Sequence, residues 1–166
     1  MHILIIFLVV IAAWRCGDWS RFYQFHATML YITAMNLLYF FFTTDYPIWS
    51  FHSDFGVPEH VLDLLHAFIV LPLTVMIFLS KFPDGRIHKV LYIGKWVLLY
   101  IIFEWAGQHL GAIEYANGWS IGWSFLFVLV MFPILRLHYA RPLAAYGLSI
   151  IIIAALLSLF DVPWIH

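Results

Sequence analysis

Apolar residues run along the chain in six long stretches that are separated by short polar segments. The stretches are residues 2–14, 27–43, 60–80, 89–110, 119–135 and 142–160. A helix needs about 20 apolar residues to cross about 30 Å of hydrocarbon, because it rises about 1.5 Å per residue. The pattern therefore predicts an all-α fold: a polytopic transmembrane helical bundle with six spans, in a single domain over residues 1–166.

The first stretch is the short one. Residues 2–14 would cover only about 20 Å as a helix. Such a segment either crosses a locally thinned bilayer or enters it part-way and turns back. A crossing span places the N-terminus outside, whereas a re-entrant segment places it inside, and both alternatives stay open here.

Composition supports a membrane environment and excludes other classes of protein. The chain is 64% hydrophobic and 10% charged, whereas soluble domains have about 45–50% apolar and about 25% charged residues. Eight Lys and Arg residues are too few to build a nucleic-acid-binding face. A single cysteine leaves no internal disulfide and no thiolate zinc site.

The basic residues predict the orientation. All but Lys95 fall in alternate loops, at Arg15, Arg21, Lys81, Arg86, Lys89, Arg136 and Arg141. Lys and Arg accumulate in cytoplasmic loops, so the first, third and fifth loops should lie inside and the C-terminus outside. The acidic residues Asp45, Asp54, Glu59, Glu114 and Asp161 fall on the opposite, outer side.

Polar residues inside the spans form a layer near the outer surface. Counted along their helices, Asn36, His66 and Glu104 all lie about 10 Å below that surface. Ionisable groups at this depth are costly and are functional candidates by default. The predicted ligand-binding residues are Asn36, Glu59, Asp63, His66, Glu104, Gln108 and His109.

Within this layer, His66 and Glu104 are expected to touch, because the third and fourth spans are joined by a short loop. An outward-open pocket around the pair could carry a proton, bind a cation or act as acid and base. The alternative is a buried hydrogen-bonded pair that only locks two helices. The side chains of Glu59, Asp63, His66 and His109 would suit zinc or another divalent ion, but no metal-binding spacing supports such a site, so no metal is assigned and the cofactor stays unknown.

A second polar group gathers at the predicted cytoplasmic face. Guanidinium groups match phosphate bidentately, so this group could bind a phosphate or an anionic lipid headgroup. The alternative is plain anchoring to headgroups and control of topology. The predicted lipid- or phosphate-binding residues are Arg15, Asp18, Arg21, Arg136, His138 and Arg141.

Four motifs resemble those of a family of small, functionally uncharacterised polytopic membrane proteins from Bacillus- and Clostridium-like bacteria. They are Trp14-Arg15-x-Gly17-Asp18-Trp19, Glu114-Tyr115-x-Asn117-Gly118-Trp119, Phe132-Pro133-x-x-Arg136-x-His138-Tyr139 and Phe160-Asp161-Val162-Pro163. The resemblance covers almost the whole chain and implies a bacterial plasma-membrane location. It implies no activity, substrate or catalytic residue.

Three functions are compatible with these features. The first is transport or binding of a small solute, cation or proton at the outward-facing pocket. The second is a non-catalytic subunit of a larger membrane complex, or a homo-oligomer. The third is an intramembrane enzyme that acts on a lipid or isoprenoid phosphate, for which Asp18 and His138 are the nearest candidates for a catalytic group. Anionic lipid at the cytoplasmic face is the expected partner.

Overall fold

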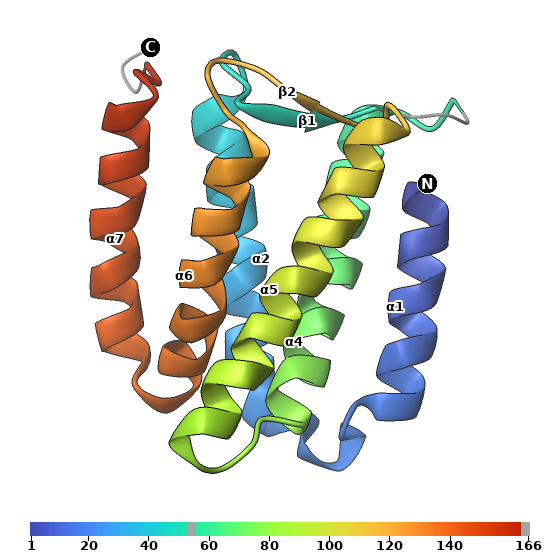
Figure 1. The fold of residues 1–166 in the computed structure, drawn as a ribbon, viewed down its shortest axis with the longest axis vertical. Helices are drawn as coiled ribbons and strands as arrows, with labels where there is room; N and C mark the ends of the chain where they lie inside the picture. Colours follow the sequence, from blue (N-terminus) through green and yellow to red (C-terminus); the bar gives the residue numbers. More distant parts are fainter. Residues whose placement is uncertain (53–55, 164–166) are drawn as a thin grey trace.

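The computed structural model describes residues 1–52 and 56–163, and it is mostly helical (Figure 1). Its elements, in chain order, are α1 (His2–Cys16), η1 (Trp19–Arg21), α2 (Phe22–Thr43), β1 (Trp49–Phe51), α3 (Glu59–Leu65), η2 (His66–Val70), α4 (Leu71–Ser80), α5 (Arg86–His109), β2 (Ile113–Tyr115), α6 (Ile121–Ala140) and α7 (Pro142–Leu159). The predicted outer-side residue Asp54 lies outside the described part.

Five helical segments are long and apolar enough to cross a membrane. They are Trp19–Thr43, Glu59–Ser80, Arg86–His109, Ile121–Ala140 and Pro142–Leu159. Each corresponds to one of the predicted stretches, so the prediction of a helical, multi-span chain is confirmed at this level. The prediction of an all-α fold was incomplete, because β1 and β2 form a short sheet.

The short N-terminal helix α1 is continuous and packs against α4 and η2. It runs from the end of the bundle that holds the sheet to the opposite end (Figure 1). The His2 ring lies against Phe51 of β1, with ring centroids 4.5 Å apart, and its Nε2 is 3.0 Å from the carbonyl oxygen of Ala112. Because α1 does not turn back, the described residues hold no counterpart of a re-entrant segment.

The two ends of the bundle differ. The α1–α2, α4–α5 and α6–α7 connections lie together at one end, whereas the sheet and the end of α7 lie at the other (Figure 1). We call these the basic end and the sheet end. In the sheet, β1 and β2 are antiparallel, with Trp49 opposite Tyr115 and Phe51 opposite Ile113. The sheet therefore ties the α2–α3 loop to the α5–α6 loop.

The segment Glu59–Ser80, which is the third predicted span, is interrupted near its middle by η2, one turn of π-helix. Pro72 follows directly, near the start of α4. Proline lacks a backbone N–H and its ring clashes with the carbonyl four residues earlier, so the preceding turn must widen. The proline is thus accommodated by a π-turn, which offsets the residues of α3 from those of α4 around the helix axis.

Two apolar clusters hold the helices together. The larger one is centred on fully buried side chains that α2, α4 and α6 contribute, among them Phe25, Met76, Phe78 and Phe132. The smaller cluster lies at the sheet end, where Ile48 and Trp119 pack against Leu157 and Phe160 of the α7 end.

Candidate functional site

His66 is buried beneath the sheet. Its side chain is 8% exposed, and its Nδ1 is 2.9 Å from the carbonyl oxygen of Leu62, one turn earlier in its own helix. The ring packs against Phe51 and His2, with centroids 4.3 and 5.2 Å apart. His66 therefore faces α1 and β1.

Glu104 belongs to a different group, at the junction of α5, β2 and α6. Its Oε1 accepts a 2.7 Å hydrogen bond from the Tyr115 hydroxyl and a second hydrogen bond from Ser124 Oγ. Trp119 Nε1 donates to the same Ser124 Oγ over 2.8 Å. Burial, together with the nearby Glu104 carboxylate, raises the pKa of Tyr115, so the tyrosine stays a donor.

The predicted contact between His66 and Glu104 is therefore not formed, because within the described residues each has other partners. The two lie on helices that pack against different neighbours: α5 packs on α6, whereas η2 packs on α1, α2 and α4. Gln108 and His109 are exposed, and His109 Nδ1 is 3.0 Å from the carbonyl oxygen of Trp105. In the described part of the chain, no three His, Cys, Asp or Glu residues gather as a metal-binding group.

Glu59 lies at the surface of the sheet end. His52, after β1, has its Nδ1 3.9 Å from Glu59 Oε1 and its Nε2 3.3 Å from Glu114 Oε2. All three side chains are about half exposed or more, and exposed ion pairs contribute little stability. Glu59 thus forms part of a solvated surface cluster.

Among the predicted ligand-binding residues that are at least partly buried, Asn36 and Asp63 lack hydrogen-bond partners in the described structure. The Oδ1 atom of Asn36 is buried, and the Asp63 side chain is partly buried. Thr33 Oγ1 donates to the carbonyl oxygen of Ala67 over 2.8 Å, which fixes the register between α2 and the third span. Asn36 follows Thr33 by three residues in α2, and Asp63 precedes Ala67 by four residues in α3, so both lie on the sheet-end side of this hydrogen bond.

At the basic end, Arg21 and Asp18 neutralise each other. Arg21 Nε lies 2.7 Å from Asp18 Oδ2, and Ser20 Oγ donates to Asp18 Oδ1 over 2.5 Å. The Ser20 and Arg21 hydrogen bonds hold the pKa of the Asp18 carboxyl below its usual range. Asp18 N donates to Ser80 Oγ over 2.9 Å, so this group ties the α1–α2 turn to the end of α4.

Arg136 has a different environment from the other arginines of this end. Its Cζ lies 4.8 Å from the ring centroid of Phe82 and 5.1 Å from that of Tyr139. Within the described residues it forms no ion pair and no hydrogen bond. Arg15 and Arg141 are exposed.

His138 does not belong with these arginines, contrary to the prediction. It is 3% exposed, its Nδ1 is 3.0 Å from Thr28 Oγ1, and its ring stacks on Tyr31 at a centroid distance of 4.1 Å. Tyr31 in turn hydrogen-bonds Ser149 of α7 over 2.5 Å. The α-helical period turns His138 inward although Arg136 and Arg141 reach the surface. With His138 buried and Asp18 paired, the proposed enzymatic role gains no support.

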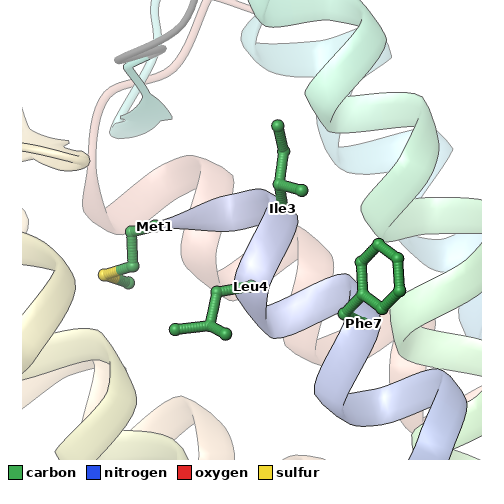
Figure 2. A pocket seen from close by; sticks show the side chains of 4 residues that line it. All are labelled: Met1, Ile3, Leu4 and Phe7. Atoms are coloured by element: carbon green, nitrogen blue, oxygen red, sulfur yellow. The ribbon is translucent and has the colours of Figure 1, made fainter.

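An apolar groove opens beside the start of α1. It has a volume of about 470 Å³ and is lined by Met1, Ile3, Leu4 and Phe7. Leu4 and Met1 point to one side of α1, and Phe7 points to the other (Figure 2). A groove lined by apolar side chains is expected where a membrane protein faces lipid chains.

Three partners of the candidate residues were not among the predicted site residues, namely Tyr115, Ser124 and Phe82. Tyr115 was detectable, because it lies in the same motif as Glu114 and Trp119, but the pairing of its loop with β1 was not.

When the chain is compared with protein-family models, curated proteins and solved structures, none of them matches it. The family resemblance therefore stays a prediction.

Proposed function

We propose that the protein is a multi-pass membrane protein that binds a proton or a small cation between Asn36 and Asp63, near its outer surface. The membrane location rests on the five long apolar helices. The proposal is carried by one observation: among the described residues, the buried Oδ1 atom of Asn36 has no hydrogen-bond donor, and neither has the partly buried carboxylate of Asp63 on the neighbouring segment Glu59–Ser80.

The two oxygen-bearing groups call for a positively charged partner. Buried polar atoms are nearly always hydrogen-bonded, and one left alone costs about 1–3 kcal/mol. Carboxylate and amide oxygens accept but do not donate when the carboxylate is ionised. A proton on Asp63, or a hard cation between the oxygens, would satisfy both groups at once. The Tyr39 hydroxyl does not serve this purpose, because it donates to the carbonyl oxygen of Trp49 over 2.9 Å.

Binding suits this position better than transport. The half of the bundle between the site and the basic end is filled by Phe25, Met76 and Phe78, each at most 1% exposed. A path for a hydrated ion across this apolar packing would need the helices to separate. We therefore propose occupancy from the outer side, with η2 providing the local freedom that a π-turn commonly gives to functional sites.

Thermal unfolding of the purified protein in detergent tests this function. Sodium and potassium chloride are compared with choline chloride, each across pH 5 to 8. A ligand at 100 times its dissociation constant stabilises by about 2.7 kcal/mol. We expect one alkali cation, or protons alone, to raise the melting temperature of the protein but not of the Asp63→Asn variant.

The matched control is Glu114→Gln, which removes an exposed carboxylate from β2 at the same end of the bundle. It should respond like the unmodified protein. The proposal is wrong if neither cations nor pH separate Asp63→Asn from Glu114→Gln.

The second candidate is a subunit of a membrane complex, and the packing of α7 favours it. This helix packs mainly against α6, and its Leu143, Ile150 and Ile151 are each more than half exposed. Native electrophoresis of membranes solubilised in mild detergent would test it, since a complex migrates well above the 19.4 kDa chain. A monomeric band would exclude a stable complex.

A further inference from the structure

The basic end holds a guanidinium group that is positioned but not neutralised. Arg136 lies in the last two turns of α6, between the rings of Phe82 and Tyr139. Aromatic rings attract the cation and hold it in place, but they accept none of its five N–H donors in the way a carboxylate would. The hydrogen-bonding capacity of Arg136 therefore remains available to a ligand.

The acidic residues nearby do not supply that ligand. Asp18 is engaged by Arg21 over 2.7 Å. Asp84, in the α4–α5 turn, is exposed and forms no ion pair with the described residues. The local charge is positive, because Lys81 precedes Phe82 directly and Lys89 lies one turn before Tyr92, whose ring contacts Phe82 at 5.8 Å.

Neighbouring elements hold the Phe82 ring, against which Arg136 packs, in place; we call this ring the seat of Arg136. Phe82 packs against Phe78 of α4 at a centroid distance of 5.3 Å. The Tyr92 hydroxyl donates to the carbonyl oxygen of Phe78 over 3.1 Å, which holds α5 beside this ring. A side chain that is ordered before binding loses less conformational entropy when a ligand arrives.

We propose that Arg136 binds a phosphate group at the basic end, and that the phosphate belongs to an anionic phospholipid. The planar fork of guanidinium donors matches phosphate oxygens bidentately, which an ammonium cannot do. Arg136 lies about one turn from the end of α6 at Ala140, which is the depth of a headgroup rather than of an acyl chain. This site is separate from the one proposed at Asn36 and Asp63.

Native mass spectrometry of the full chain tests the proposal. The protein is exchanged into micelles that contain phosphatidylglycerol or phosphatidylcholine, and the retained lipids are counted. The expected result is preferential retention of phosphatidylglycerol. Because charge-assisted bidentate bonds are about twice as strong as ordinary ones, Arg136→Gln should lower that retention by about tenfold or more.

The control variant is Arg141→Gln, which removes the same charge from the same end at an exposed position. General attraction to an anionic surface is about 1 kcal/mol per basic residue, so this control should lose no more than about fivefold. Phe82→Leu keeps the charge but removes part of the seat, and it should lower retention as Arg136→Gln does. Equal losses in the two arginine variants would overturn the proposal, as would equal retention of the two lipids.

A separate arm identifies the source of the phosphate. Inorganic phosphate is titrated into lipid-free detergent while thermal unfolding is followed. No shift is expected for a site that needs the lipid. A shift that Arg136→Gln abolishes would keep the phosphate chemistry but overturn the lipid assignment.

Discussion

The hydroxyl of Tyr115 and the carboxylate of Glu104 lie 2.7 Å apart and join the loop strand β2 to the end of the helix that precedes it. Ser124 of α6 completes the arrangement from the other side of the loop. A carboxylate that was predicted to line a binding pocket is thus engaged by two hydroxyl donors. These two hydrogen bonds connect α5, β2 and α6.

Replacing Tyr115 by Phe should destabilise the protein by about 1.5–3 kcal/mol, the range for hydrogen bonds to charged groups. Unfolding in mixed micelles measures the loss. Tyr23→Phe removes a hydroxyl from a side chain that is 90% exposed and should change little. If both variants unfold alike, the hydroxyl of Tyr115 does not fasten the loop.

Gly17 should not tolerate a side chain. A Cβ there would lie 2.5 Å from the carbonyl oxygen of Ala13 and 2.6 Å from Met76 Cε, so Gly17→Ala should lower the melting temperature. At Gly94, by contrast, a Cβ would meet nothing within 4 Å. Because alanine is favoured over glycine inside a helix, Gly94→Ala should instead stabilise by about 0.5–1 kcal/mol. A thermal unfolding comparison should therefore show a lower melting temperature for Gly17→Ala and a higher one for Gly94→Ala.

Removing the Thr28 hydroxyl should destabilise the protein. Thr28→Val leaves Nδ1 of the buried His138 without its 3.0 Å partner, which costs about 1–3 kcal/mol. The matched control is Thr44→Val, because Thr44 is exposed and bonds only to the carbonyl oxygen of Phe40. A similar small effect in both variants would show that His138 is satisfied in another way.

Cys16 provides a built-in test of orientation. It is the single cysteine of the chain and is exposed at the end of α1 that lies at the basic end. The positive-inside rule places this end in the cytoplasm. A membrane-impermeant maleimide should therefore leave intact cells unlabelled and react after permeabilisation, whereas a cysteine introduced at Glu114 should react in both. Labelling of Cys16 in intact cells would show that the basic end faces outward and would contradict this prediction.

The Asp18–Arg21 pair should produce a defined pH dependence. The folded pKa of Asp18 is lowered, so its stabilising effect is present above the unfolded value of about 3.9 and is lost as pH falls through the folded value. The difference in melting temperature between the protein and Asp18→Asn should be constant at neutral pH and shrink below about pH 4. Asp84→Asn, at the same end but without an ion pair to the described residues, serves as the control.

The spans were predictable because hydrophobic length is a property of the sequence alone. The predicted stretch 60–80 and the observed Glu59–Ser80 differ by one residue at their starts. Helix rotation was not predictable, and it decides whether a residue at the right depth meets its expected partner. Glu104 and His66 were placed at one depth, but packing of α5 on α6 turns the carboxylate toward Ser124. The pairing of two distant loops in the sheet likewise has no local signal, since each strand has only three residues.

The sheet also imposes an order on biogenesis. Since β1 precedes α3 and β2 follows α5, the ribosome completes two further spans before the first strand meets its partner. During that interval β1 presents unpaired backbone groups beside the membrane, where another strand could capture them. A nascent chain arrested between α4 and α5 should therefore remain open at the sheet end, and that end can close only after α5 and the following β2 have been synthesised.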